Sequence, residues 1–239
     1  MATVTAPTTT SAFLAWLEDW YRRLPAASLA ETIAAAGGPD RVAIVTIDVI
    51  VGFTSEGRLA SPRIQAIVGP IRDFLIRAHD LGVRHILFDQ DAHPPDSPEF
   101  RAFGPHCIAG TREAETAPEL ASLPFFSEVT VQRKRSLSIG IDTQLDDWLA
   151  ARPQLHTFIV VGDCTDLCIY QGAMYLRLQA NARGLEREVI VPANLVATFD
   201  VPVPTAEQLG ILPHDGDLMH RLFLYHLALN GIRVVAELR

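Results

Sequence analysis

The sequence predicts an α/β protein with a doubly wound, mostly parallel six-stranded sheet and helices on both faces. Strand-like and helix-like runs alternate from Arg41 onward, as they do in parallel sheets. Residues 42–47 form a continuous apolar run, which is typical of a strand buried on both faces. Hydrophobic residues make up 49% of the 239 residues, enough for a substantial core.

We predict two short helices over residues 11–36, because the apolar side chains of this segment recur at helical spacing. Residues 1–10 are Thr-rich, and we expect them to be frayed. A break follows at residues 37–40, which read Gly-Gly-Pro-Asp. No linker comes later, so we predict a helical extension over residues 1–40 and one domain over residues 41–239.

The remaining elements follow from the same patterns. Apolar runs predict further strands, and helical periodicity between them predicts the helices. The expected strands after the first are 84–88, 128–132, 157–161, 188–191 and 233–236, and the expected helices are 62–80, 145–151, 166–183 and 217–229. The loop over residues 90–127 is too long for a simple connector, and loops of this length are usually functional.

Composition and charge exclude several classes of protein. The net charge is −8 and no long run of Lys or Arg stands out, which disfavours a nucleic-acid partner or an anionic membrane. No run of 18 apolar residues could span a membrane, and the N-terminus has no secretory signal pattern. The three cysteines are an odd number and lack the spacing of a disulfide framework. They therefore fit reduced thiols, and we expect a cytoplasmic protein.

One carboxylate and two imidazoles occur on the Pro-rich loop: Asp91, His93 and His106. Three such ligands can hold a divalent metal with positions left open for a substrate. Asp89 competes with Asp91, but it belongs to the strand, and we expect its side chain to point to the other face. A structural alternative is that the Asp-x-His pair only caps a turn. The other six histidines show no ligand spacing.

A candidate nucleophile, Cys168, lies near the start of the helix after the fourth strand. With Thr165 as N-cap, its thiol would lie near the positive end of the helix, which favours the thiolate. Lys134 leaves the third strand at the same edge of the sheet, and Asp48 directly follows the first. Asp48 could take the thiol proton. Singly, these residues could be a core cysteine, a solvated lysine and a turn cap.

These motifs resemble a known family. Residues 44–48 followed by Gly52 and Phe53, then Lys134, then residues 162–168, are similar to the isochorismatase-like cysteine hydrolases. The resemblance covers residues 41 to about 200. The metal stretch, residues 91–94 and 105–111, resembles the nicotinamidase branch.

The resemblance implies a catalytic triad of Asp48, Lys134 and Cys168 on a six-stranded parallel sheet. The thiolate would attack an amide carbonyl, ammonia would leave, and water would clear the thioester. A cis bond between Asp163 and Cys164 is implied as well. The backbone N–H groups of Cys164 and Cys168 would then form the oxyanion hole.

The resemblance also implies one divalent metal on Asp91, His93 and His106, with zinc as first choice, iron or manganese as alternatives, and no organic cofactor. The pyridine nitrogen of nicotinamide, the first candidate substrate, would coordinate it. Phe53 and Phe103 are candidates for the apolar wall of the substrate site.

This chain departs from the nicotinamidase pattern at three positions. Ala92 stands where an aromatic residue is usual, Ser97 where a histidine is usual, and Arg135 where a glycine follows the lysine. The pocket could therefore be wider, or built for another small amide.

Three functions remain open. The first is cleavage of nicotinamide or a related carboxamide by a homo-oligomeric enzyme. The second is hydrolysis of a different small amide or of an enol ether such as isochorismate, although Cys168 argues against the ether. The third is a catalytically silent binding subunit, which the filled triad disfavours.

Overall fold

Six parallel strands form the main path of the central sheet in the computed structural model, which describes residues 9–239. Their order is β4-β3-β2-β5-β6-β8, and the short β7 (Val196–Ala197) pairs with β5. The bounds are β2 (Val42–Ile47), β3 (His85–Asp91), β4 (Thr130–Lys134), β5 (Thr157–Asp163), β6 (Glu188–Pro192) and β8 (Arg233–Val235). The predicted doubly wound sheet is confirmed. The sequence predicts that residues 1–10 are frayed, but residues 1–8 lie outside the described part of the chain.

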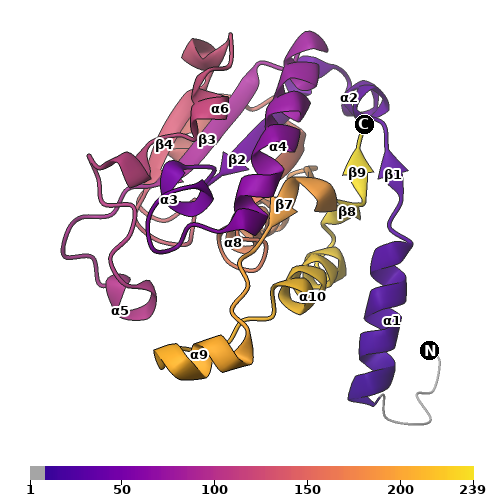
Figure 1. Ribbon diagram of the computed structural model, residues 1–239. Helices are drawn as coiled ribbons and strands as arrows, with labels where there is room; N and C mark the ends of the chain where they lie inside the picture. The colour runs from indigo at the N-terminus through magenta and orange to yellow at the C-terminus, as the bar shows by residue number, and fades with distance from the viewer. Residues whose placement is uncertain (1–8) are drawn as a thin grey trace.

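Helices cover both faces of the sheet (Figure 1), and each face has one hydrophobic core. One core receives α2 (Leu29–Ala36) and α4 (Pro62–Asp80). The other receives α7 (Leu145–Ala150), α8 (Cys168–Arg183) and α10 (Gly216–Leu229). Alternate residues of β2 serve the two cores, which explains why the whole strand is apolar.

The strand order reverses between β2 and β5. From β2 the chain moves outward through β3 and β4, and it then returns to β5 on the other side of β2. Ligands of open α/β sheets bind beyond the carboxyl ends of the strands at such a switch point. Asp48 follows β2, and the segment 164–168 follows β5.

Four strands, β3, β4, β5 and β6, end later than the sequence predicts. β3 continues to Asp91, and β4 continues to Lys134, because Asp89 pairs in register with Gln132 and Asp91 with Lys134. The expectation that Asp89 points to the face opposite Asp91 is wrong. The two residues lie two positions apart in one strand, so their side chains share a face.

The helix that carries Cys168 begins two residues later than predicted. Cys168 is its first residue, and Leu167 occupies the N-cap position without a side-chain capping bond. The prediction that Thr165 caps this helix is therefore wrong. The Thr165 hydroxyl instead lies 2.9 Å from Nδ1 of His220.

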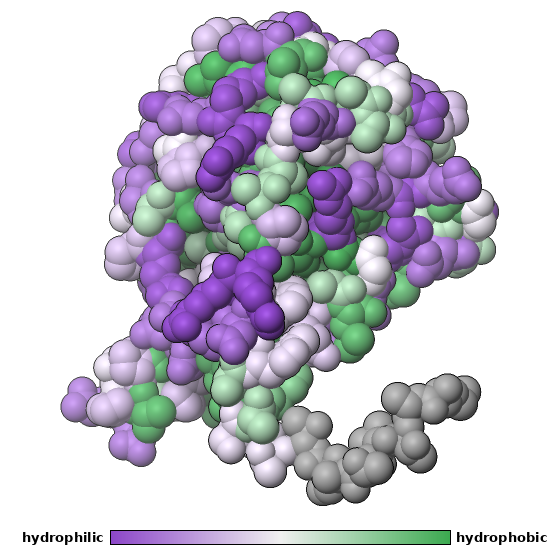
Figure 2. Space-filling model, turned by 90° about the vertical axis from the view of Figure 1, so that its right-hand side faces the viewer, coloured by the Kyte–Doolittle hydropathy of each residue, from purple (hydrophilic) through white to green (hydrophobic). Residues whose placement is uncertain are grey.

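The N-terminal segment is helical, as predicted. It contains α1 (Thr10–Arg22), the short β1 (Ala26–Ala27) and α2. β1 pairs in parallel with the C-terminal β9 (Glu237–Leu238), and α1 packs against α10. Figure 2 turns this side toward the viewer and shows hydrophilic residues interspersed with smaller hydrophobic areas. The boundary at residue 40 stays a prediction.

The long loop after β3 carries only short helices. They are α5 (Phe100–Phe103), η2 (Arg112–Ala114), α6 (Pro118–Ala121) and η3 (Phe126–Glu128). The other short helices are η1 (Pro39–Arg41), α3 (Val51–Thr54), η4 (Ala193–Leu195) and α9 (Val203–Leu209). Among residues 9–239, no helix combines the length and apolar character needed to cross a membrane.

Candidate active site

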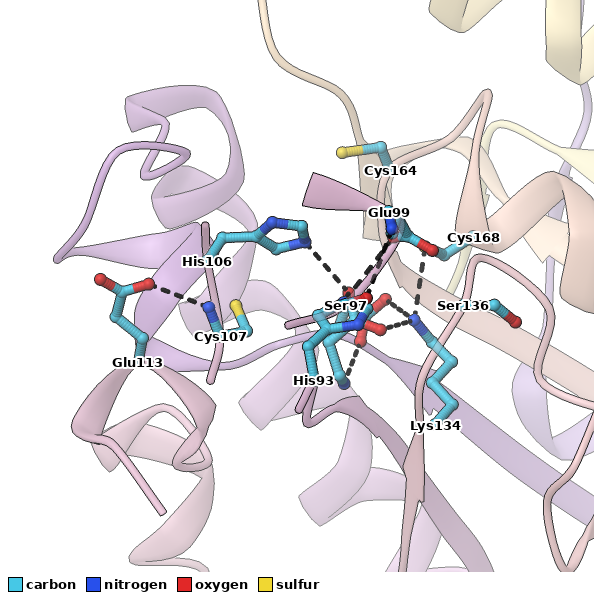
Figure 3. Close-up of polar contacts among 12 residues, drawn as sticks. His93, Ser97, Glu99, His106, Cys107, Glu113, Lys134, Ser136, Cys164 and Cys168 are labelled. Carbon is cyan, nitrogen blue, oxygen red and sulfur yellow. Dashed lines mark hydrogen bonds and ion pairs between the residues drawn. The ribbon is translucent and has the colours of Figure 1, made fainter. Parts of the chain in front are cut away.

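Asp48, Lys134 and Cys168 meet at the carboxyl edge of the sheet. Lys134 Nζ lies 2.7 Å from Asp48 Oδ2 and 3.5 Å from Cys168 Sγ. It also lies 2.5 Å from Asp91 Oδ1. Figure 3 shows the Lys134 side chain pointing toward Cys168. The structure therefore brings together all three residues that the sequence singles out for the triad.

The Asp48 carboxylate is oriented by its backbone and by β3. Asp48 adopts a positive φ of 56°, which is uncommon for a residue other than glycine and often marks a functional site. Its N–H donates to the Asp89 carbonyl over 2.9 Å. Its Oδ1 accepts the N–H of Asp91 over 2.8 Å. Its other oxygen, Oδ2, is the one that contacts Lys134.

Burial and neighbouring charges set the ionisation of the triad. Burial and the charge of Asp91 raise the pKa of Asp48 to about 6, against the opposing effect of Lys134. Burial alone would lower the pKa of Lys134, but Asp48 and Asp91 outweigh it and raise that pKa well above its usual value. The triad thus contains a buried ammonium beside a carboxylate that is ionised at neutral pH.

Burial opposes the predicted preference for a thiolate. Burial raises the pKa of Cys168 well above its usual value, and the charge of Lys134 opposes this only in part. The thiol is 5% exposed, so desolvation outweighs the start of α8. Cys168 therefore needs a base to take its proton, and the Asp48 carboxylate, which contacts the same lysine, is the candidate.

The metal candidates also converge. Asp91, His93 and His106 lie together with Glu99, and one potential ligand atom from each of the four lies within 4.8 Å of the others. His93 Nε2 is 3.3 Å from Asp91 Oδ2, and His106 Nε2 is 3.9 Å from the same oxygen. Figure 3 shows the side chains of His93, Glu99 and His106 directed toward one centre beside Lys134.

The donor atoms of this cluster suit a divalent cation. His106 Nδ1 donates to the Gly104 carbonyl over 2.8 Å, which leaves Nε2 free to coordinate. Within residues 9–239, both ring nitrogens of His93 and Oε1 of Glu99 are buried without a hydrogen-bond partner. Such orphaned polar atoms are costly unless a ligand satisfies them.

The charge on Asp91 fits the same purpose. Burial would raise the pKa of this carboxyl, but Lys134 and His93 outweigh burial and lower it. Asp91 is thus ionised and can bind a cation. Its Oδ1 meets Lys134 and its Oδ2 faces the histidines, so Asp91 joins the metal candidates to the triad.

Aromatic rings border the cluster. The ring centroid of Phe53 lies 5.8 Å from that of His106, and the centroid of Phe103 lies 6.2 Å from it. Phe100 contacts both histidines, with centroid distances of 5.6 Å to His93 and 5.5 Å to His106. The two predicted wall residues therefore lie beside the metal candidates, together with a third ring.

Sequence reasoning missed Glu99 and Phe100. Ser97 stands at the position where a histidine is usual, whereas the carboxylate of Glu99 comes two residues later. Ser97 instead accepts the backbone N–H of Glu99 over 3.4 Å. A carboxylate on the same loop was the available signal, but its approach to His93 depends on the loop's path.

The backbone near the cysteine has the predicted cis bond between Asp163 and Cys164. The Cys168 N–H, at the start of α8, is among the groups that lack an intrahelical partner. All three cysteines are buried and free. Burial raises the pKa of Cys107 and of Cys164 as well, and only the Cys168 sulfur is found in contact with Lys134 in residues 9–239.

Comparison with known proteins supports one family. The family model described as "Isochorismatase domain" matches residues 42–208. Nicotinamidase 1 of Arabidopsis thaliana is 29% identical over 218 residues, which cover 82% of this chain and 86% of the plant protein. The nicotinamidase/pyrazinamidase of Mycobacterium tuberculosis is 29% identical over 180 residues, 70% of this chain and 93% of that protein.

Solved structures agree with this match. The N-carbamoylsarcosine amidase of Thermoplasma acidophilum superposes with a TM-score of 0.61 at 25% identity, covering 82% of this chain and 95% of that one. The matched region includes every residue of the buried cluster from Asp48 to Cys168.

Proposed function

The chain belongs to the isochorismatase domain family, in its nicotinamidase-like branch, and we propose that it is a cysteine-dependent amidohydrolase of small carboxamides, with nicotinamide as first candidate. The nicotinamidase relatives support a hydrolase that acts on amide C–N bonds. The observation that carries the proposal is the contact of Lys134 with both Asp48 and Cys168, next to a set of metal-ligand side chains.

In the first half of the reaction, Asp48 takes the proton of the Cys168 thiol. The sulfur attacks the carbonyl carbon, and the backbone N–H groups of Cys164 and Cys168 hold the oxyanion. The C–N bond then breaks. The proton on Asp48 passes to the leaving nitrogen, so ammonia departs and a thioester remains on Cys168.

In the second half, water attacks the thioester carbon. Asp48 accepts the proton of this water and then returns it to the departing sulfur, so the carboxylic acid leaves and the thiol is restored. Lys134 stays protonated throughout. It balances the charges of Asp48 and Asp91 and offsets part of the cost of forming the buried thiolate.

The residues that would hold a divalent ion, zinc first, are Asp91, His93, Glu99 and His106. Bound there, the ion would supply a Lewis-acid anchor for a ring nitrogen of the substrate. Phe53, Phe100 and Phe103 border this position and would exclude water from an aromatic ring. This anchoring would convert binding energy into orientation of the amide toward Cys168. The homo-oligomer and the cytoplasmic location stay predictions.

The test compares nicotinamide with benzamide, which has the same shape but lacks the ring nitrogen, by ammonia release from the purified protein. We expect nicotinamide to be hydrolysed much faster. Equal rates, or no hydrolysis of either, would contradict the proposed anchoring of the ring nitrogen. A panel of aliphatic and N-carbamoyl amides, run in parallel, identifies another amide as substrate if Ala92 leaves a wider pocket.

A further inference from the structure

Two histidines from the C-terminal region hold adjacent residues of the segment between β5 and α8. This segment, residues 163–168, ends in Cys168 and is called the cysteine loop below. His220 Nδ1 lies 2.9 Å from Thr165 Oγ1, and His214 Nε2 lies 2.8 Å from Asp166 Oδ2. Both partners are buried, with exposures of 0% for Thr165 and 6% for Asp166.

His214 meets an acceptor at each ring nitrogen. Its Nδ1 lies 2.9 Å from the Phe199 carbonyl oxygen, and its Nε2 faces the Asp166 carboxylate. Neither a carbonyl nor a carboxylate can donate, so both nitrogens must carry a proton. Burial works against this charge, but Asp166 outweighs it and raises the pKa of His214. The ring also stacks on Phe199 at 3.9 Å, which fixes its plane.

His220 is a neutral link between α1 and the cysteine loop. Its Nε2 lies 3.3 Å from the hydroxyl of Tyr21, and its Nδ1 faces Thr165. Burial, with the nearby Arg63 and Arg221, lowers the pKa of this ring to about 4. Each partner is a hydroxyl that can donate or accept, so a neutral ring satisfies both.

The two histidine contacts add to the backbone hydrogen bonds of the cysteine loop, such as that of the Thr165 N–H to the Ala197 carbonyl. α8 has no side-chain capping bond at Leu167, so the helix start does not fix the segment by itself. The segment carries the thiol and the two N–H groups assigned above to the oxyanion. A displacement of about 1 Å there can cost on the order of 100-fold in rate.

We propose that His214 and His220 are positioning residues that hold the cysteine loop in its reactive geometry, His214 through Asp166 and His220 through Thr165. The inference rests on the proposed function in assigning chemistry to this loop. It gives a role to the residues 213–220, which the family motifs leave without one, and it makes Tyr21 of α1 the outer end of the His220 contact.

The test exchanges each histidine for Asn and for Gln. The Asn amide nitrogen lies as many bonds from Cα as Nδ1 does, and the Gln amide nitrogen as many as Nε2. His214→Gln can therefore still reach Asp166, whereas His214→Asn cannot. For His220 the order reverses, because Thr165 faces Nδ1: His220→Asn can reach Thr165, whereas His220→Gln cannot.

Two readouts are measured: kcat and KM for nicotinamide, and the rate at which iodoacetamide alkylates Cys168, identified by mass spectrometry. We expect both His214→Asn and His220→Gln to lose more kcat and alkylation rate than their partner variants, by about tenfold or more, with KM little changed. The same exchanges at His156, a half-buried histidine at the other end of β5, serve as control.

Equal losses for Asn and Gln at either histidine would overturn its positioning role and indicate packing alone. A change confined to KM would overturn it as well. If even the unmodified protein releases no ammonia from any amide, the proposed function fails, whereas the order of the alkylation rates still decides the positioning role. Circular dichroism checks that each compared variant is folded. A variant that does not fold is replaced by Asp166→Asn or Thr165→Val, for which we expect the same loss of alkylation.

Discussion

Lys134 and Asp48 form an ion pair that is closed to solvent: Nζ lies 2.7 Å from Oδ2, and both side chains are 0% exposed. A buried pair of this kind is costly to break, because removing one partner leaves an uncompensated charge. Lys134 also contacts the Asp91 carboxylate and the Cys168 thiol. The pair is therefore a structural element of the site as well as a proposed part of its chemistry.

Replacement of this lysine should affect both stability and turnover. We expect Lys134→Ala to lower the free energy of unfolding by about 3–5 kcal/mol, measured by urea denaturation. Turnover by the remaining folded protein should fall because the thiolate loses its cation. Lys134→Arg keeps the charge but presents a planar fork, so it should restore stability better than turnover. Near-full turnover in Lys134→Ala would remove the lysine from the triad, with Arg133 or Arg135 as the next candidates.

Cys168→Ala should abolish ammonia release while leaving the fold intact, because the sulfur forms the thioester and the smaller side chain fits the same space. Activity assays and circular dichroism check the two parts. Iodoacetamide should inactivate the unmodified protein by labelling Cys168. If peptide mapping instead found the inactivating label on Cys164 or Cys107, the assignment of the nucleophile would be wrong.

Activity should fall on the acidic side through the pKa of Asp48, which is about 6. Asp48 accepts the thiol proton only when ionised, so kcat/KM should decrease about tenfold per pH unit below that value. A bound divalent cation near Asp91 would favour the ionised form and move this limb to lower pH. A kcat/KM profile from pH 4 to 9 measures it, with unfolding monitored over the same range. A flat profile down to pH 4 in metal-loaded protein that stays folded contradicts the role of Asp48.

Glu99→Gln should weaken divalent-metal binding, because the substitution removes one of two carboxylates from the cluster. Loss of a direct ligand should cost at least the roughly 10–100-fold in affinity seen for outer-shell partners of metals. Zinc content by elemental analysis, and competition with a chelator, give the readout without relying on activity. Glu115→Gln, the same exchange at an exposed position of the same loop, is the matched control and should bind zinc as the unmodified protein does. Unchanged affinity in Glu99→Gln excludes the glutamate as a ligand.

Gly162→Ala should destabilise the protein strongly. Gly162 has a φ of +120°, and a Cβ there would lie 2.0 Å from the carbonyl oxygen of Ile47, just before Asp48. Backbone strain alone costs roughly 1–3 kcal/mol, and the clash adds to it. Gly184→Ala is the control: its φ is +63°, but no atom lies within 4 Å of the added Cβ. A smaller loss of unfolding free energy at residue 162 than at residue 184 would contradict this account.

Local sequence patterns were sufficient to predict the sheet and most of the candidate site residues. The apolar run of 42–47 is the strand β2, and the helical periodicity of 62–80 is the helix α4. Asp48, Lys134 and Cys168 follow from their places at strand ends and at a helix start, because parallel strands bring their carboxyl ends to one edge. Chain order and side-chain periodicity are encoded locally, so they can be read from the sequence.

Only the tertiary structure decided which side chains complete the site and how they ionise. Glu99 reaches His93 through the path of a loop, and His214 and His220 reach the cysteine loop from residues some 50 positions away in the chain. The pairing of Asp91 with Lys134 extended β3 past its apolar run and turned Asp89 to the same face. Burial, a property of the whole fold, raises the pKa of Cys168 although this residue begins a helix. Contacts between distant segments and the exclusion of water have no local signature, which is why these features required the folded chain.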